Sequence, residues 1–394
     1  MIRAEIGRSN HMNSFEAGKE ACEIALKRLG EKPNLILTFS TSSYDQKEIL
    51  KGIRNACPEV PVVGCSSSGE ITTEGPLSKH IVLMALKTER IKFVIEIGKG
   101  AKENSFEAGK AMAKKIKDKA LKDLKLLIIL TEGLPENGAA IVRGIQSVLG
   151  RELPIIGGAA GDDFQFKETY QYFNEEVLKG AVIGIGLCGD FSFGIGVKHG
   201  WEPIGLPMKV TRSKGAKLIE VDNQPALHIY EGYFGKKAEE LIKEPIAKIA
   251  YTYPLGMKVG GTSELLIRDV VIANEKGEID CAAEIPEGAE IRLMLSDPEK
   301  AILAAKEAAL NALTQLNNLF PQTILVFDCM ARRKLLGQKA KEEISAIQEI
   351  LGKRVALIGF YTYGEIAPLG GELGKECFSV WHNETLTLLT LAEE

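Results

Sequence analysis

Apolar and polar residues follow one another in blocks that recur in the same order along this chain. Each block has a continuous apolar run of strand length, as expected for a strand covered on both faces. These runs are Leu35–Ser40, Leu126–Thr131 and Ile324–Phe327. A stretch with helical spacing of apolar residues follows each run, at about 45–56, 136–149 and 338–351. A further strand closes each block, near 80–86, 181–187 and 385–391.

A helix also precedes each apolar run, and two of these helices begin with the same seven residues. The sequence Asn-Ser-Phe-Glu-Ala-Gly-Lys occurs at 13–19 and again at 104–110. Asn13 with Glu16, and Asn104 with Glu107, have the spacing of an N-cap residue and an acid that satisfy each other's free amides. In the third block Asp297 and Pro298 start the helix, with proline where its missing N–H costs nothing.

The three blocks predict a mixed α/β (α+β) protein made of three diverged α-β-α-β-β modules, with mixed sheets layered with helices. The modules are expected at 13–98, 104–198 and 297–391, within an N-terminal domain 1–221 and a C-terminal domain 222–394. Residues 200–295 do not follow the repeat. Short strands are expected there, with a helix at Glu231–Ile242, and their topology stays open.

Composition excludes several classes of protein. The 394 residues carry a net charge of −4 with acids and bases interspersed, so neither a nucleic-acid stripe nor a polybasic membrane patch is expected. The longest apolar stretch, Gly180–Gly189, is too short to span a bilayer, and the N-terminus has no signal-peptide core. Seven scattered cysteines without a CxxC pair indicate reduced thiols, and we expect a cytoplasmic protein.

A loop of small residues ending in an acid follows the Pro-x-x-Gly strand of each of the first two blocks, and the third has a similar loop. Such a loop is either a tight turn that needs glycine or a site where backbone N–H groups meet a ligand. The chemistry that the loop carries differs between the copies, and this divergence favours a ligand. The candidate residues are Ser66, Ser67, Gly157, Gly158, Asp162, Asp163, Tyr361, Tyr363 and Glu365.

Two arginines follow or lie within buried strands and therefore need partners. Arg332 needs a protein acid such as Glu365 or an anionic ligand, and Arg268 needs Asp269, another acid or a ligand. Cys329 and Cys65 are candidate nucleophiles, although a buried cysteine is more often a small hydrophobic residue. A cysteine-dependent enzyme is thus one alternative function.

Histidines provide a second alternative. The five histidines form no HExxH or Cys/His cluster, so no structural metal site is expected. Haem needs only one axial histidine, and His199 or His382 would supply it.

These segments resemble the FIST family of sensory proteins. Val63–Glu70, Ile156–Asp163 and the His-Gly-Trp run at 199–201 are similar to its N-terminal part. Cys329-x-x-Arg332, Gly359–Ile366 and the His-Asn-x-Thr run at 382–385 are similar to its C-terminal part. The resemblance implies binding of a small ligand, amino acids being the usual suggestion. Some members bind haem and sense nitric oxide.

The resulting expectation is a sensor that binds a small molecule without a bound cofactor. No appended kinase, cyclase, chemotaxis or F-box region is visible, so output through a separate partner protein is expected. An arginine and an acid facing each other would suit an amino-acid zwitterion. We therefore expect a pocket at Arg332, Tyr361, Tyr363 and Glu365, with His382 and Asn383 as further binding residues.

Overall fold

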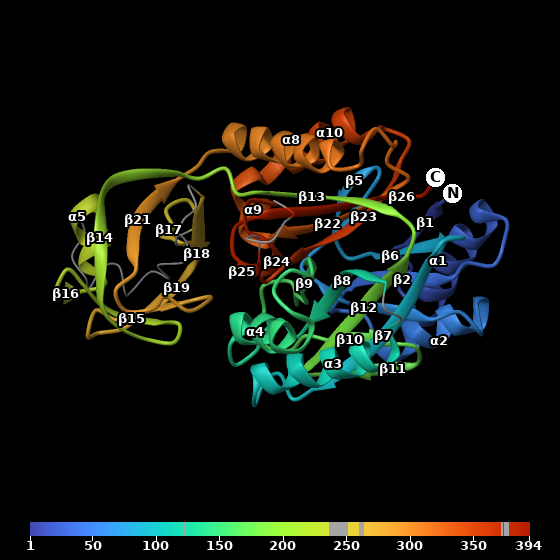
Figure 1. Ribbon diagram of the computed structural model, residues 1–394, viewed down its shortest axis with the longest axis horizontal. Coiled ribbons are helices and arrows are strands. Elements are labelled where there is room, and N and C mark those ends of the chain that lie inside the picture. Colours follow the sequence, from blue (N-terminus) through green and yellow to red (C-terminus); the bar gives the residue numbers. More distant parts are fainter. Residues whose placement is uncertain (121–122, 236–250, 260–263, 372, 374–377) are drawn as a thin grey trace.

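The computed structural model describes residues 1–120, 123–235, 251–259, 264–371, 373 and 378–394. Figure 1 shows a large body built of three similar units, with a separate sheet on one side. The mixed α/β class and the three diverged units are confirmed.

Every unit begins with a strand that precedes the repeated helix. In the first unit the elements are β1 (Arg3–Ser9), α1 (Ser14–Leu29), β2 (Leu35–Thr41), α2 (Gln46–Ala56), β3 (Val62–Ser67), β4 (Glu70–Thr72), β5 (Gly75–Leu77) and β6 (Ile81–Lys87). In the second they are β7 (Ile91–Lys99), α3 (Ser105–Lys119), β8 (Leu124–Thr131), α4 (Gly138–Leu149), β9 (Ile155–Ala159), β10 (Gln171–Phe173), β11 (Glu176–Leu178) and β12 (Ala181–Gly189).

The third unit has the same order but is interrupted after its first strand. Its elements are β13 (Ser192–Lys198), α8 (Pro298–Thr314), β22 (Thr323–Cys329), α9 (Met330–Leu336), a 3₁₀ turn (Gly337–Lys339), α10 (Ala340–Leu351), β23 (Ala356–Thr362), β24 (Glu365–Pro368), a second 3₁₀ turn (Leu369–Gly371), β25 (Ser379–His382) and β26 (Leu386–Ala392). The predicted unit borders were therefore wrong by one strand. β7 pairs with β12 and β13 pairs with β26, which assigns each of them to the unit that follows.

The interruption between β13 and α8 forms a sheet of its own, the inserted sheet. Its elements are β14 (Glu202–Lys214), β15 (Lys217–Val221), β16 (Gln224–Pro225), α5 (His228–Phe234), β17 (Leu255–Lys258), β18 (Leu265–Arg268), β19 (Val270–Ala273), β20 (Ile279–Cys281) and β21 (Glu290–Leu295). The expected helix at Glu231–Ile242 ends at Phe234 within the described residues, and 236–250 lie outside them. A domain border at 221 would divide this sheet between β15 and β16, which pair with each other.

The units exchange hairpins in a closed cycle. The sheet of the first unit runs β1-β6-β2-β3 and continues into β10-β11 of the second unit. The second unit's sheet, in turn, continues into β24-β25 of the third, and the third unit's sheet continues into β4-β5 of the first. Each unit thus contributes a short hairpin that pairs with the edge strand of a neighbouring unit's sheet. There the hairpin covers backbone groups that would otherwise be unpaired.

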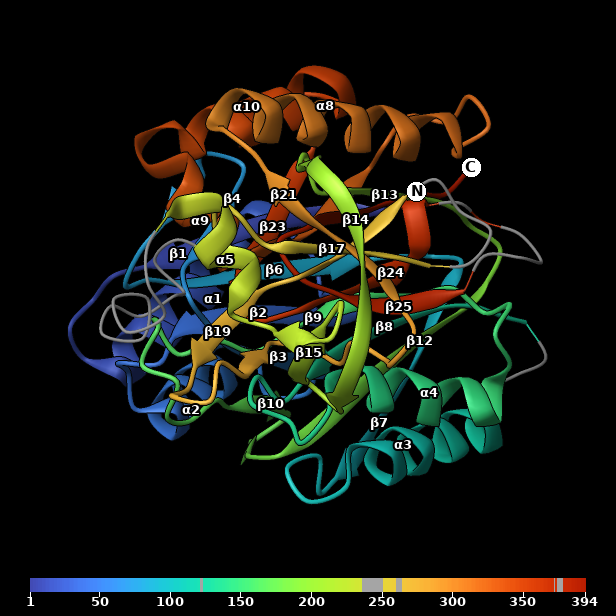
Figure 2. The ribbon, with the colours of Figure 1, turned by 90° about the vertical axis from the view of Figure 1, so that its left-hand side faces the viewer.

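Successive side chains of the central strands point alternately to opposite faces of the sheet and therefore pack in two different core layers. On β2, Leu37 and Phe39 point into a core shared by all three sheets, whereas Ile36 points toward α1 and α2. Leu325 and Phe327 of β22 enter the same shared core. A helix pair covers the outer face of each unit, and in Figure 2 α8 with α10 and α3 with α4 lie on opposite sides of the body.

The repeated heptapeptide has a packing role. Asn13 and Asn104 accept hydrogen bonds from the backbone N–H groups of Glu16 and Glu107, at 3.1 Å each. The expected reciprocal bond is replaced at Asn13, whose N–H donates to His11 Nδ1. In the same helix Gly18 lies against the backbone carbonyl of Ile49 in α2, where a Cβ atom would clash. The glycine of the motif therefore allows the two helices to cross closely.

Candidate functional site

A large cavity lies where the second unit, the third unit and the inserted sheet meet. Its volume is about 890 Å³, enough for a drug-sized ligand. The wall comes from five regions: the segment that leads into α4, the loop between β9 and β10, the inserted sheet, helix α9, and the ends of β22, β23 and β25. In Figure 1 this junction lies between the inserted sheet on the left and the α4 and α9 regions. We call it the junction cavity.

The turn between β25 and β26 forms the floor of the junction cavity. Trp381 and Asn383 line it and are 2% and 1% exposed, whereas Glu384, the next residue, is fully buried and is not part of the lining. Within the described part of the chain, no hydrogen-bond partner reaches Trp381 Nε1 or Asn383 Oδ1. Buried polar groups almost always have partners, so these two atoms indicate a place that a ligand or water completes.

The same turn occurs in all three units, which makes Glu384 unusual. Lys79 and Glu384 precede the last strand of their unit by two residues and Gly180 by one; the φ values of Lys79, Gly180 and Glu384 are 57°, 63° and 51°. Glycine adopts this left-handed conformation without steric cost, whereas other residues lose about 1 kcal/mol or more. Lys79 is exposed, but Glu384 is fully buried. A strained, buried acid at a position where glycine serves in another copy favours a functional role.

Glu384 lies beside a second acid from the inserted sheet. Asp269, between β18 and β19, lines the junction cavity, and its carboxyl group lies within hydrogen-bonding reach of Glu384. Burial raises the pKa of Asp269 to about 6, while burial and the charge of Asp269 hold the pKa of Glu384 far above its usual value. Two carboxyl groups can bond to each other only through a proton, so the pair holds one at neutral pH.

Cys329, at the end of β22, also lines the junction cavity. Burial raises the pKa of its thiol well above the usual value, and the carboxyl groups of Glu365, Glu384 and Asp269 raise it further. The lining contains no histidine that would act as a base. Cys65 is likewise buried, with a pKa raised by burial. Both thiols are therefore protonated at neutral pH, which does not suit a cysteine nucleophile.

The loop between β9 and β10, which we call the aromatic loop, forms another part of the cavity wall. Phe166 stacks on Tyr363 with 4.8 Å between ring centroids, and the ammonium group of Lys334 lies 3.2 Å from the centroid of Phe164. Asp162 holds this loop by accepting the backbone N–H groups of Phe166, at 2.9 Å, and of the two residues that follow. The hydroxyl of Tyr363 donates to the same carboxylate. The loop and Tyr363 of the third unit together place three aromatic rings at the cavity.

Among the candidate ligand-binding residues from the sequence, only Tyr363 and Asn383 line the junction cavity. Arg332 has no exposed surface and is fully engaged inside the third unit. Its guanidinium group pairs with Asp328, at 2.9 Å, and with Glu343, and donates to the carbonyl oxygens of His199 and Ala301. Arg332 therefore does not face Glu365 across a pocket, and four of its five N–H groups are engaged inside the protein.

The acidic residues at the ends of the small-residue loops accept hydrogen bonds that stabilise local structure. Glu365 accepts hydrogen bonds from the Thr362 hydroxyl, at 2.5 Å, and from the Thr385 N–H, at 3.1 Å. In the first unit Ser67 donates to Glu70 in the same way, at 2.6 Å. Asp163 accepts the Thr41 hydroxyl at 2.6 Å, which connects the second unit to the first.

The remaining loop residues are buried in the sheets or their connections. Ser66 donates to the Gly161 carbonyl at 2.8 Å, and Gly157 and Gly158 pair with β24. Tyr361 is fully buried below the guanidinium group of Arg333, which lies 4.7 Å from its ring centroid.

Arg268 and His382 support the cavity from behind. Arg268 donates to the carbonyl oxygens of Glu284, at 2.8 Å, and of Trp381, at 3.2 Å, so it does not pair with Asp269. His382 is buried, and its Nε2 lies 3.1 Å from the carbonyl oxygen of Ala367. Burial lowers the pKa of this imidazole to about 3, which leaves it neutral.

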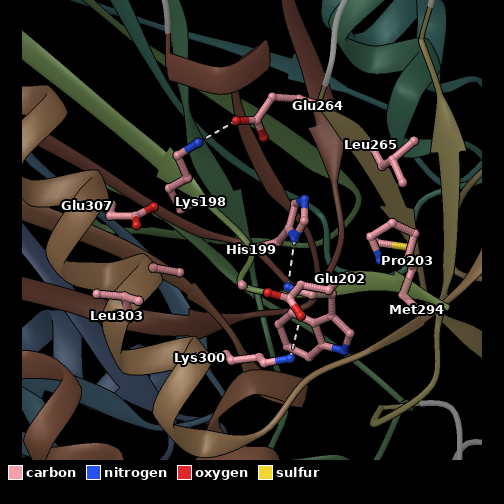
Figure 3. Close-up of a pocket in the computed structure, with 13 residues that line it drawn as sticks. Lys198, His199, Glu202, Pro203, Glu264, Leu265, Met294, Lys300, Leu303 and Glu307 are labelled. Atoms are coloured by element: carbon pink, nitrogen blue, oxygen red, sulfur yellow. Dashed lines mark hydrogen bonds and ion pairs between the residues drawn. The ribbon is translucent and has the colours of Figure 1, made fainter.

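His199 lies in a different, smaller cleft of about 330 Å³, shown in Figure 3. Its Nδ1 accepts the backbone N–H of Trp201 at 2.9 Å, and the surrounding charges pair with one another, Lys198 with Glu264 and Lys300 with Glu202. A haem needs an open imidazole face beside a large apolar space. Neither His199 nor His382 offers one, so the residues present do not fit haem.

Sequence reasoning missed Glu384, Asp269, Trp381 and the two phenylalanines of the loop. A signal was present for Glu384, because aligning the three closing strands places it opposite Gly180. No comparable signal marks Asp269, whose proximity depends on how the inserted sheet docks.

Relatives exist in archaea and bacteria. An uncharacterised protein of Methanocaldococcus jannaschii is 27% identical over 390 residues, covering 90% of this chain and 73% of its own. An uncharacterised protein of Mycobacterium tuberculosis is 25% identical over 387 residues, covering 94% and 96%.

Solved structures are similar only at a distance. Cyanuric acid hydrolase from A. caulinodans has a TM-score of 0.39 at 9% identity, covering 100% of this chain and 99% of its own. A chorismatase has a TM-score of 0.36 at 7% identity, covering 100% and 98%. Scores of this size are too low to support a functional inference.

Two family models match consecutive parts of the chain. The FIST N domain matches residues 34–224 and the FIST C domain matches residues 226–368. FIST domains are associated with sensory signal transduction and small-ligand binding. No helix of the described residues is long and apolar enough to cross a membrane. The two matches together cover most of the sequence, and the protein belongs to the FIST family.

Proposed function

We propose that this protein is a small-ligand receptor and that its ligand binds in the junction cavity. The observation that carries the proposal is the set of buried polar atoms on the cavity floor that lack partners among the described residues. A mostly apolar cavity with a few converging polar groups is the usual form of a small-molecule site. An amino acid or a similar small metabolite is the proposed ligand, with Tyr363 and Asn383 among the residues that contact it.

The position of the junction cavity supports a signalling role. One wall belongs to the inserted sheet and the others to the second and third units. A ligand that contacts Asp269 on one side and Asn383 on the other would favour the arrangement in which the two parts are close together. A ligand shifts a conformational equilibrium by its differential affinity for the two states. A separate partner protein in the cytoplasm would read that shift, without nucleic acid or membrane insertion.

Thermal-shift screening against amino acids and related metabolites tests the proposal. Ligand at a hundred times its Kd should raise the free energy of unfolding by about 2.7 kcal/mol. Trp381→Phe and Asn383→Ala remove one polar group each from the cavity floor and should reduce the shift. Glu307→Ala, in the smaller cleft of Figure 3, is the matched control and should leave the shift unchanged. A shift that survives both floor variants would place the ligand elsewhere and contradict the proposal.

A further inference from the structure

Two neutral polar groups lie unpaired at the floor of the junction cavity. Trp381 and Asn383 line the cavity and are almost completely buried. Among the described residues, the indole N–H of Trp381 reaches no acceptor, and the side-chain oxygen of Asn383 reaches no donor. A buried donor or acceptor that stays unpaired costs free energy, so native proteins rarely leave one open. A ligand that brings one acceptor and one donor would pair both groups.

The indole ring of Trp381 is held in place by close packing against two backbones. A Cβ atom at Gly138 would lie 2.5 Å from Cδ2 of the ring, and a Cβ atom at Gly364 would lie 2.3 Å from its Cζ2. The ring therefore packs against the start of α4 and the turn before β24 at a distance that only glycine permits. The N–H donor is thus fixed before a ligand binds, which reduces the entropy that binding costs.

The donor and the acceptor come from one short segment. Trp381 lies in β25 and Asn383 follows this strand directly. Side chains two residues apart along extended chain project to the same side, and both of these line the same cavity. The intervening His382 is turned away and lies with its Nε2 3.1 Å from the carbonyl oxygen of Ala367. A single small polar group of a ligand is therefore suited to meet both side chains.

The charged residues of the lining do not select a ligand of one sign. The two lysines form no ion pair with a described acid, and like Glu136 they stand at exposed positions where water solvates them. Glu284 pairs with Arg143. Asp269 lies within hydrogen-bonding reach of Glu384. An anion would be attracted by the lysines and repelled by the acids, and the reverse holds for a cation. The charged lining residues are Glu136, Asp269, Glu284, Lys214 and Lys334.

Aromatic rings form the apolar part of the site. Phe164 and Phe166 of the aromatic loop line the junction cavity together with Tyr363. Rings of this kind bury flat apolar groups by offset stacking or edge-to-face contact. The volume of about 890 Å³ accommodates a ring system next to the floor. The ligand body would therefore lie against the rings, with its polar group directed to Trp381 and Asn383.

We propose that the junction cavity recognises a neutral carboxamide attached to a flat apolar body. A carboxamide carries a strong acceptor and a strong donor on one planar, uncharged group. Its carbonyl oxygen accepts the indole N–H of Trp381, and its N–H donates to the side-chain oxygen of Asn383. The inference rests on the proposed function and names the chemical class of the metabolite.

Four small probes test the inference on the full chain, with affinities measured by saturation-transfer NMR. Benzamide, acetophenone, benzoate and benzylamine share a ring and differ in the polar group. Benzamide should bind about tenfold more tightly than acetophenone, which keeps the acceptor but lacks the donor. It should also bind more tightly than the anion and the cation. Equal binding of benzamide and acetophenone would overturn the inference.

The charged probes separate this inference from the proposed function. Tighter binding of benzoate would assign recognition to the lysines, and tighter binding of benzylamine would assign it to the acids. Either result would overturn the carboxamide while leaving the cavity as a ligand site. Binding of none of the four would also overturn it, and the thermal-shift screen against metabolites then decides the proposed function on its own.

Two variants assign the two hydrogen bonds. In Asn383→Ala, benzamide should bind no more tightly than acetophenone, because the acceptor for its N–H is gone. Trp381→Phe should weaken both probes by a similar factor of about ten, because both carry the carbonyl oxygen. A variant that only loosened the fold would weaken all probes and keep the preference for benzamide. A preference that persists in Asn383→Ala would therefore overturn the inference.

Glu284→Gln is the matched control within the same lining. This acid is already engaged by Arg143 and Asn137, so its replacement should leave the affinities for benzamide and acetophenone unchanged. Circular dichroism and Tm establish that each variant is folded.

Discussion

Tyr363 makes two contacts with the aromatic loop: its ring stacks on Phe166, and its hydroxyl donates a hydrogen bond to the carboxylate of Asp162. Asp162 in turn accepts three backbone N–H groups of the same loop. One side chain of the third unit therefore fixes a loop of the second unit at the mouth of the junction cavity.

Tyr363→Phe separates these two contributions, because it removes the hydrogen bond and keeps the stacked ring. We expect a loss of about 1 kcal/mol in the free energy of unfolding, typical of one hydrogen bond. The loop backbone at 163–168 should exchange its amide hydrogens faster, as measured by hydrogen exchange with mass spectrometry. Thr73→Val, which removes a hydroxyl from a turn far from the cavity, is the control. Unaltered exchange in Tyr363→Phe would contradict the role of the hydroxyl.

Arg332→Leu should destabilise the protein strongly. The change leaves Asp328 and Glu343 buried without their cation, which typically costs about 3–5 kcal/mol. Urea unfolding followed by circular dichroism measures this loss. Lys334→Ala, two residues further in the same helix at an exposed position, should change stability by less than about 1 kcal/mol. Equal effects of the two variants would mean that the buried network contributes little.

Gly18→Ala tests the helix crossing that the repeated heptapeptide creates. The added methyl group meets the Ile49 carbonyl, so overpacking should cost about 1–3 kcal/mol. Gly232→Ala in α5 is the matched control, because the space around it is open and its φ is not positive. This control should be neutral or stabilising by up to about 1 kcal/mol. Thermal unfolding of both variants gives the comparison, and a Gly18→Ala protein as stable as the parent would refute the crossing argument.

Stability should fall as pH rises from about 5 to 8. Burial raises the pKa of both Glu70 and Glu365 to about 8, so the folded protein keeps protons that the unfolded chain releases above its ordinary carboxyl pKa. Each such group lowers the free energy of unfolding by up to about 1.4 kcal/mol per pH unit within that window. Glu70→Gln should therefore be more stable than the parent at pH 8 and gain little at pH 5. Parallel pH profiles of parent and variant would show that Glu70 is ionised when folded.

Cys329 should react slowly with iodoacetamide at neutral pH, because its burial and the surrounding acids keep the thiol protonated. Mass spectrometry after timed labelling, with Cys329→Ser to identify the site, measures the rate. Fast alkylation at pH 7 would instead revive the cysteine-enzyme alternative.

How much of the fold could be predicted from the sequence depended on the internal repeat. Apolar runs such as Leu35–Ser40 and the cap at Asn13 depend on neighbours in sequence, so pattern and propensity were sufficient for them. Arg332 was correctly interpreted as a buried charge that needs a partner, but its partners are Asp328 and Glu343 rather than Glu365. The direction of its side chain decides this, and spacing alone does not specify that direction.

The cavity was harder to predict because its parts come from distant segments. Asp269 and Glu384 are far apart in the sequence, and they meet only because the inserted sheet docks on the turn after β25. The exchange of hairpins was equally hidden. Nothing in the short segment Glu70–Leu77 says that its partner strand is β23 of the third unit.

That exchange also affects how the chain is made. A ribosome delivers the first unit early, yet Ile71 pairs with Gly359, which is synthesised much later. Until then the β4-β5 hairpin has no acceptor strand, and the third sheet cannot be completed. Contacts this distant in sequence slow folding, and a fragment ending after the FIST N domain would leave an open strand edge. The N-terminal and C-terminal parts of this chain thus each complete a sheet of the other.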